Sequence, residues 1–350
     1  MDVLNVAKAI TYLRKRAGFT QKDLADRLGV SDKAVSKWER GLGLPDVSLL
    51  GKLSIILDTD TDSLLAGDVI HHDRGWHGLL ILHDNVCGIG PDTIVYDKPL
   101  VYYLLSYFLL VGIRNVKIIC SDDAKRYIRN EFLVKKPLNV TLTFGSGISD
   151  AVNDETFVAC DNLMVLFGRS FIYGVDMTKF FQKAMSNKDK ITVLTLPRGV
   201  KDASSIVRFD ANKKIVPPDH DDQLKTQYDY CDIPLFFCPK TTFCETFCAS
   251  SVDYNISLIF EDQDVYIEVL DRGFVEIELN DWDDVAEAAA FVKIVQSRCG
   301  MILYCIEEVA WRRGYISYEA MKMMADVNSN TAYSDYLRKL GDGFAPEKGR

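Results

Sequence analysis

Two lysines in the N-terminal part of the chain have the type and the spacing needed to contact a nucleic acid. Lys33 and Lys37 are four residues apart, which is about one helical turn, so both ammonium groups fall on one face of a helix. From such a face a lysine reaches guanine acceptors or phosphate oxygens in the major groove of DNA. The spacing of the pair therefore has the geometry that such contacts need, and the elements around it must decide whether the contacts form.

Helix signals on both sides of this segment predict the elements that must position it. A first helix starts near Leu4 and ends at Gly18, and Thr20 then caps a second helix, with Asp23 in capping-box position. Gly29 gives a tight turn, and Ser31 caps a third helix over residues 32–40. Two short helices joined in this way predict a helix-turn-helix, whose second helix enters the major groove. Further helical patterns follow at residues 46–57 and 61–65.

The charge of the chain is unevenly distributed. Residues 1–45 carry nine basic and five acidic side chains, a balance of +4, whereas the whole chain of 350 residues carries −9. The remainder therefore sums to −13. A basic head on an acidic body indicates that only the head meets a polyanion.

Composition narrows the class of protein and its compartment. With 48% hydrophobic and 26% charged residues, the chain is neither disordered nor of low complexity. No apolar run reaches the ~18 residues that span a bilayer, and no signal peptide is evident. Nine cysteines, an odd number without a CxxC pair, favour reduced thiols over a disulfide or a zinc site. We expect a cytoplasmic, nucleoid-associated protein that does not contact a membrane.

From Gly78 onward, apolar runs of strand length alternate with helical patterns. This order predicts an α/β domain with a mostly parallel sheet covered on both faces. The histidine-containing segment GDVIHHDRGWHG before it is interpreted as a polar linker rather than a metal site. The predicted domains are 1–68, a linker at 69–77, an α/β domain at 78–298 and a helical tail at 299–343. The predicted elements are strands at 79–82, 116–120, 140–144, 163–167, 191–196, 205–209, 233–238 and 265–270, an amphipathic helix at 99–111, and further helices at 124–132, 177–185 and 285–298.

The segment LRKRAGFTQKDLADRLGVSDKAVSKWERGLGLPDVSLLGKLSIILDTDTDSLL resembles the Cro/lambda-repressor-like (XRE) DNA-binding family over its whole length. The resemblance implies that double-stranded DNA is the partner, the alternative being a helical interaction module that does not bind DNA. Gln21 and Arg40 would face phosphate or the adjacent helix, while Ala34, Val35 and Trp38 would lie in the core. By the same resemblance, four residues of the third helix would face base edges: Asp32, Lys33, Ser36 and Lys37. Together with the helix cap, the expected DNA-binding residues are Gln21, Ser31, Asp32, Lys33, Ser36, Lys37 and Arg40.

After residue 78 a second resemblance covers nearly all of the chain. Three segments look, in the correct order, like glucose-1-phosphate thymidylyltransferases, which are sugar nucleotidyltransferases: IVYDKPLVYYLLSYFLLVGIRNVKIIC, LMVLFGRSFIYGVDM and CIEEVAWRRGYISYEAMKMMADVNSNTAYSDYLRKL. The resemblance implies a Rossmann-like nucleotidyltransferase fold with a helical tail. It also implies assembly into homodimers or homotetramers.

The same resemblance exposes departures at the catalytic positions. The family's GGxGTR nucleotide loop is replaced by HDNVCGIGPD, and the magnesium-binding aspartate of its LGDN motif becomes Arg169. A guanidinium cannot coordinate a cation. We therefore expect no catalytic residues, no metal ion and no cofactor. The degenerate site would be a ligand pocket made of His83, Asp84, Asp150, Arg169, Asp221 and Glu278.

The sequence favours a transcriptional regulator whose inactive body senses a sugar phosphate or a nucleotide sugar, oligomerises, or does both. Arg169 would either replace magnesium as the partner of a phosphate or form an internal ion pair with Asp150 or Glu278. The alternative is an active sugar-1-phosphate nucleotidyltransferase with a fused DNA-binding domain.

Overall fold

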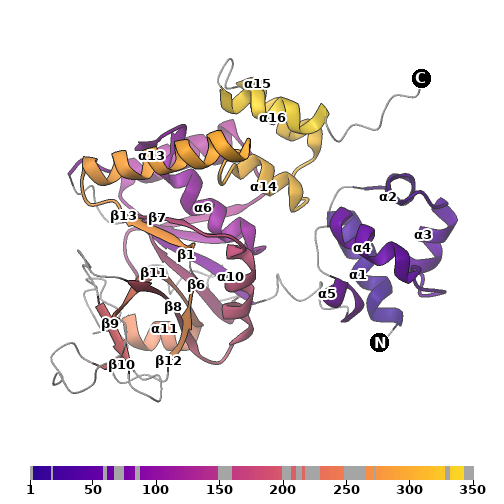
Figure 1. Ribbon diagram of the computed structural model, residues 1–350, viewed down its shortest axis with the longest axis horizontal. Helices are drawn as coiled ribbons and strands as arrows, with labels where there is room; N and C mark the ends of the chain where they lie inside the picture. Colours follow the sequence, from indigo (N-terminus) through magenta and orange to yellow (C-terminus); the bar gives the residue numbers. More distant parts are fainter. Residues whose placement is uncertain are drawn as a thin grey trace. The chain divides into compact units, whose positions relative to one another are not determined.

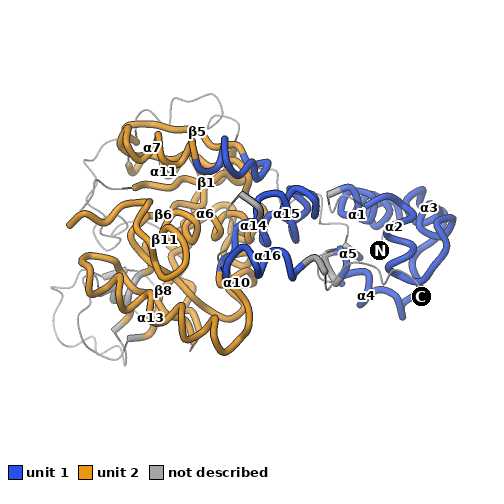
Figure 2. Tube along the Cα trace, turned by 90° about the horizontal axis from the view of Figure 1, so that it is seen from above, with its two compact units in different colours: residues 1–74, 131–140, 304–350 blue, residues 75–130, 141–303 orange. Residues whose placement is uncertain are grey.

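The structure is a computed structural model that divides into two compact units, coloured separately in Figure 2. Unit 1 comprises residues 1–74, 131–140 and 304–350, and unit 2 comprises residues 75–130 and 141–303. The structure describes residues 3–16, 19–57, 61–66, 75–82, 87–148, 160–198, 206–209, 215–216, 229–247, 265–271, 273–327 and 332–342.

The N-terminal part of unit 1 is helical (Figure 1) and contains the predicted helix-turn-helix. Thr20 caps α2, its hydroxyl accepting from the Asp23 amide while the Asp23 carboxylate accepts from the Thr20 amide. Gly29 ends α2 with φ of 75°, a conformation that glycine adopts without strain. The hydrophobic core of these N-terminal helices contains Leu24 of α2 and Val35 of α3. The helices are α1 (Val3–Arg16), α2 (Gln21–Leu28), α3 (Asp32–Glu39), α4 (Val47–Ile56) and α5 (Thr61–Ala66).

The remainder of unit 1 joins a short internal segment to the C-terminal helices. The fully buried ammonium of Lys136 pairs with the equally buried carboxylate of Glu307 at 2.6 Å. Tyr333 donates its hydroxyl hydrogen to the same carboxylate, and Tyr336 donates to Glu308 at 2.7 Å. Charged side chains are rarely buried unless paired, so this cluster fastens residues 131–140 to the tail. The elements are the π-helix η2 (Asn130–Lys135), α14 (Ile306–Arg312), α15 (Tyr318–Val327) and α16 (Ala332–Asp342).

Unit 2 is built on a nine-stranded sheet whose parallel core confirms the predicted fold class. Strands β5, β4, β1 and β6 pair in parallel in that order, with Gly78 of β1 opposite Val116. Among the nine described strands of this sheet, seven run in one direction, and only β10 and β11 oppose them. The strands are β1 (Trp76–Ile81), β4 (Asn115–Ile119), β5 (Thr141–Gly145), β6 (Asn162–Phe167), β8 (Ile191–Arg198), β9 (Ile206–Phe209), β10 (Ile215–Val216), β11 (Asp229–Pro239) and β12 (Val265–Val269).

Helices pack on both faces of the sheet. Phe243 and Phe247 of α11 (Lys240–Phe247) join the core cluster that contains Leu79. On the other side, a side chain at Gly78 would lie 2.6 Å from Phe108, so α6 (Leu100–Leu110) packs directly against β1. Strand β1 begins at Trp76, which places the last two residues of the predicted linker 69–77 in the sheet. The other elements of unit 2 are β2 (Ile94–Val95), β3 (Lys98–Pro99), α7 (Asp122–Arg129), β7 (Ser170–Tyr173), α10 (Met177–Ser186), β13 (Val275–Glu278) and α13 (Trp282–Cys299).

Residues 100–110 form the predicted helix α6, but the prediction that this helix is amphipathic was wrong. Residues 100–109 are all buried, because β7 packs against the helix in addition to the sheet. Its polar groups are satisfied internally: Tyr103 donates to the Val95 carbonyl, and Tyr107 donates to the Ile172 carbonyl. Within the described ranges, no helix has both the length and the apolar character needed to cross a membrane.

Candidate functional site

The outer face of α3 carries the residues predicted to contact DNA. Asp32, Lys33, Lys37 and Arg40 are exposed, and Ser36 is half-buried between them. In the part of the chain that the structure describes, neither lysine ammonium has a hydrogen-bond acceptor or an ion-pair partner. The two cations are therefore exposed one turn apart, as their spacing predicts.

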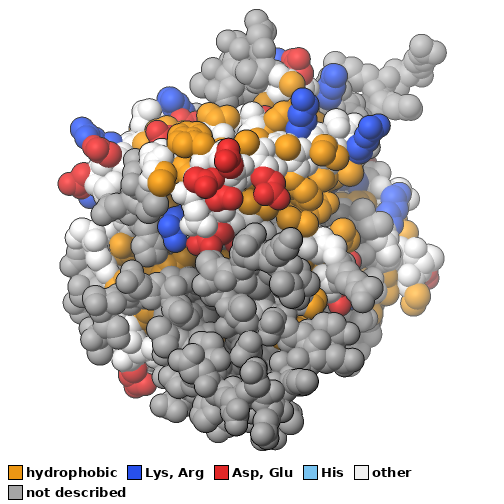
Figure 3. Space-filling model, turned by 60° about the vertical axis from the view of Figure 1, so that its left-hand side comes forward, with side chains coloured by type: hydrophobic (Ala, Val, Ile, Leu, Met, Phe, Trp, Pro, Cys, Tyr) orange, Lys and Arg blue, Asp and Glu red, His pale blue; other side chains and the backbone are white. Residues whose placement is uncertain are grey.

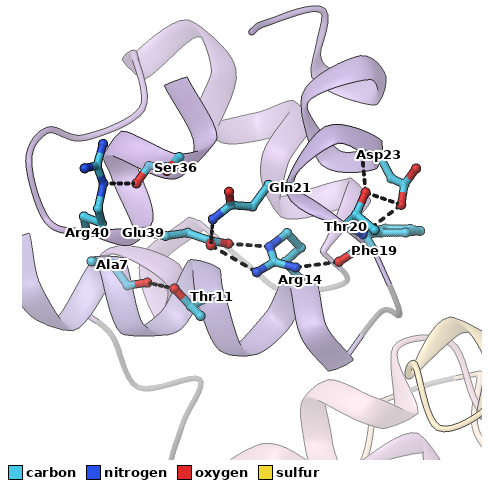
Figure 4. Close-up of polar contacts among 10 residues, drawn as sticks. All are labelled: Ala7, Thr11, Arg14, Phe19, Thr20, Gln21, Asp23, Ser36, Glu39 and Arg40. Carbon is cyan, nitrogen blue, oxygen red and sulfur yellow. Dashed lines mark hydrogen bonds and ion pairs between the residues drawn. The ribbon is translucent and has the colours of Figure 1, made fainter. Parts of the chain in front are cut away.

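A buried polar cluster fixes α3 against the two preceding helices (Figure 4). The Glu39 carboxylate accepts from Arg14 Nε at 2.5 Å, from Arg14 Nη2 at 3.0 Å and from Gln21 Nε2 at 2.6 Å. Arg14 Nη1 also donates to the Phe19 carbonyl at 2.6 Å. The side chains of Arg14 and Glu39 are only 10% and 6% exposed. Of the two positions expected for Gln21, the structure therefore shows the one facing the adjacent helix.

Three other predicted residues make local contacts that shape the ends of α3. The Ser31 hydroxyl accepts from the Ala34 amide at 3.2 Å, which is the predicted cap. Asp32 accepts from the Lys33 amide at 2.8 Å, and Arg40 Nε donates to the Ser36 carbonyl at 3.2 Å. Both Asp32 and Arg40 are exposed, so their free polar atoms remain accessible to a ligand.

The sequence analysis identified the exposed residues of α3 but missed the pair that holds the helix in place. The sequence analysis did not predict that Arg14 and Glu39 form an ion pair. The available signal was periodicity, because Arg14 follows buried Ile10 by four residues and Glu39 follows buried Val35 by four. A charged residue on a buried stripe must find a partner. Val35 and Trp38 are buried, as predicted, whereas Ala34 is half-buried and packs against the edge of the core.

A second site lies just after the end of β6 in unit 2, where Gly168 and Arg169 form the turn between β6 and β7. A Cβ at Gly168 would lie 2.4 Å from Leu82 Cδ2, so a larger residue in this turn would force the leucine side chain to move. Arg169 Nη2 lies 3.3 Å from Glu278 Oε1, and the two side chains are 36% and 29% exposed. The Leu279 amide donates to the Arg169 carbonyl at 2.8 Å.

The structure thus brings together two of the six predicted pocket residues. Their ion pair is one of the alternatives that the sequence left open for Arg169. His83, Asp84, Asp150 and Asp221 lie outside the described residues. This contact uses only one of the five N–H donors of the Arg169 guanidinium. The other donors are of the type that binds carboxylates and phosphates.

The seven cysteines whose side chains the structure describes are free thiols. Burial raises the pKa of Cys120 and of Cys160 to about 11. Cys238 and Cys305 are also buried, and burial raises the pKa of both thiols. A protonated thiol is a poor nucleophile and a poor metal ligand, so these four residues serve the core. Over the described residues, no three His, Cys, Asp or Glu side chains form a metal-binding group.

Known families match the two parts of the chain separately. A helix-turn-helix family matches residues 10–64, and a nucleotidyl transferase family matches residues 91–217. A glucose-1-phosphate thymidylyltransferase of Neisseria meningitidis is 27% identical over 70% of this chain and 90% of its own length. Enzymes of the same name from Mycolicibacterium smegmatis and Xanthomonas campestris are 25% and 22% identical, over 75% and 70% of this chain and 95% and 88% of their own lengths.

Proposed function

Because the chain joins a helix-turn-helix domain to a nucleotidyl transferase domain, we propose that it is a sequence-specific DNA-binding transcriptional regulator. The carrying observation is the exposed face of α3, on which Lys33 and Lys37 have no protein partner among the described residues. Helix α3, which carries this face, is held against α1 by the ion pair between Arg14 and Glu39. The two ammonium groups therefore project from a helix whose position is fixed. Contacts to phosphates provide affinity, and contacts to base edges provide sequence preference.

The test is DNA binding by the double variant Lys33→Ala/Lys37→Ala, with DNA from the protein's own promoter region. We expect the double variant to bind this DNA more weakly. The slope of log Kd against the logarithm of the salt concentration should also fall by up to about 2, because each phosphate contact contributes roughly 0.9 to that slope. Lys179→Ala/Lys188→Ala removes the same charge from exposed positions of unit 2 and serves as the control. Equal affinity and slope for the two double variants would show that this face does not contact DNA.

We further propose that the body does not catalyse nucleotidyl transfer. That reaction needs a metal ion to neutralise the charge developing on the transferred phosphoryl group. Magnesium requires oxygen ligands, whereas the position after β6 offers the guanidinium of Arg169, paired with the carboxylate of Glu278. The residues present do not fit a magnesium ion at this position.

The same pair supports recognition of an anionic ligand of the kind implied by the relatives' substrates, a sugar phosphate or a nucleotide sugar. A ligand phosphate would use the Arg169 donors that Glu278 leaves free. Such a ligand regulates DNA binding only if it prefers one arrangement of the DNA-binding domains over another.

Isothermal titration of the full chain with glucose 1-phosphate and with dTDP-glucose tests ligand recognition. We expect binding heat that Arg169→Ala abolishes and that Arg126→Ala, at an exposed position of α7, leaves unchanged. Absence of heat with both ligands, together with a DNA affinity that neither ligand changes, would eliminate the sensor.

An active sugar-1-phosphate nucleotidyltransferase is the second candidate. It is favoured by the similarity to enzymes of that name over 88–95% of their length. Pyrophosphate release above background from a nucleoside triphosphate and glucose 1-phosphate, lost in Glu278→Ala, would support this candidate against the inactive body.

A further inference from the structure

Helix α13 carries a row of four exposed apolar residues on its outward face, from its first residue to Ile294. Trp282 and Ile294 are 57% and 62% exposed, and Ala286 and Ala290 are exposed between them. The four residues recur every fourth position, so they form one stripe. In Figure 3, in which the side of the protein carrying α13 comes forward, hydrophobic and acidic side chains lie next to each other on the surface. Isolated exposed apolar residues are common, but a continuous stripe indicates an interaction surface.

The charges beside this stripe are separated by sign along the helix. Exposed acidic residues, Asp283 and Glu287, lie in its first half, and exposed basic residues, Lys293 and Arg298, lie in its second half. In the described part of the chain none of these four side chains has an ion-pair partner. A partner helix with the same distribution is complementary only if it runs antiparallel.

The stripe and the charges are symmetric about a single position. Trp282 and Ile294 are each six residues from Ala288, and Asp283 and Lys293 are each five residues from it. In a two-fold antiparallel pair of helices, residues equally far from the axis on opposite sides fall in the same layer. Each indole would then meet an isoleucine, and each aspartate a lysine, in both halves of the contact. The small side chains of Ala286 and Ala290 would allow close approach at the centre.

We propose that α13 is the surface through which two copies of this chain associate, with the helices antiparallel and the two-fold axis crossing the exposed face between Ala286 and Ala290, at the height of Ala288 along the helix. This inference rests on the proposed function and specifies the surface through which the body pairs the DNA-binding domains. The opposite face of the helix packs on its own unit through Val285, Ala288 and Val292, so association needs no rearrangement of the helix. A two-fold pair of helix-turn-helix domains suits a palindromic DNA site.

The test is the oligomeric state of the full chain without DNA, by sedimentation over a range of concentrations. We expect a dimer whose Kd rises at least ~10-fold in Asp283→Lys and in Lys293→Asp, because each substitution places two like-charged pairs in the symmetric contact. The double variant Asp283→Lys/Lys293→Asp restores opposite charges and should recover the dimer. Recovery excludes misfolding as the cause of the single-variant effects.

Ile294→Asp provides an independent test of the apolar stripe. It should shift the chain toward monomer with an unchanged circular dichroism spectrum. Met323→Asp, at an exposed apolar position of α15 in unit 1, is the matched control and should remain dimeric.

A dimer unaffected by Ile294→Asp and by both charge reversals would place the contact elsewhere and overturn the proposal. Single variants that dissociate without recovery in the double variant would refute the antiparallel pairing. A monomeric wild-type chain at all concentrations would overturn the inference while leaving the proposed function open to the Lys33 and Lys37 experiment, which does not depend on it.

Discussion

Replacing Glu39 by alanine should loosen the DNA-binding helix without touching its exposed face. The substitution removes the acceptor of three hydrogen bonds and leaves the Arg14 guanidinium, 10% exposed, without its carboxylate. Breaking a buried ion pair from one side costs about 3–5 kcal/mol, and we take about 3 because Arg14 keeps the Phe19 carbonyl. Since 1.4 kcal/mol is about a factor of ten, the opening equilibrium of the helix-turn-helix should rise on the order of 100-fold.

Hydrogen exchange of the full chain, followed by mass spectrometry, measures this opening for each segment. Amides of α1 to α3 should exchange about 100-fold faster in Glu39→Ala, with those of unit 2 unchanged. Asp123→Ala breaks an exposed ion pair with Arg126 and should alter exchange little. Adding Arg14→Met to Glu39→Ala should recover part of the protection, because no unpaired charge remains. If Glu39→Ala affects exchange no more than Asp123→Ala does, the buried pair does not hold α3.

Three more substitutions test other parts of the structure. Gly168→Ala would place a carbon 2.4 Å from a leucine side chain and should destabilise unit 2 by about 1–3 kcal/mol in denaturant unfolding. Lys136→Met leaves the buried carboxylate of Glu307 without its cation, so protease cleavage of the C-terminal helices should accelerate. Hydrogen bonds from Thr20 hold the pKa of Asp23 below its usual 3.8. The ionised Asp23 carboxylate therefore stabilises the folded state fully above pH 3.8, and this stabilisation is lost as the pH falls through the lower pKa of the folded state. Asp23→Asn should weaken the decrease of the thermal unfolding temperature at acid pH.

Local signals predicted the local structure well. The capping box at Thr20 and the glycine after α2 fix where the helices of the head begin and end, and both depend on neighbouring residues alone. The strands of the sheet core were likewise found from short apolar runs, for example residues 163–167 within β6. Such signals operate within about one turn or one strand, which is the range over which periodicity carries information.

The interactions that hold the functional residues could not be predicted in the same way. Lys136 and Glu307 are 171 positions apart, and Arg169 and Glu278 are 109 positions apart, so no local pattern relates them. The environment of α6 was misjudged for a related reason. An amphipathic helix was expected here, but Tyr107 donates to the distant Ile172 carbonyl and is buried. A polar side chain shows its environment only when its partner is known.

The two sites proposed for unit 2 lie next to each other in the chain, which provides a physical route between them. Glu278, the partner of Arg169, is the last residue of β13, and α13 begins four residues later at Trp282. The Leu279 amide, between these points, donates to the Arg169 carbonyl. A phosphate that draws Arg169 away from Glu278 would therefore act on the junction that positions the proposed dimer helix. By thermodynamic linkage, a ligand that changes the dimerisation constant by some factor must bind the dimer and the monomer with affinities that differ by the corresponding factor. The apparent affinity for the ligand must therefore change with protein concentration.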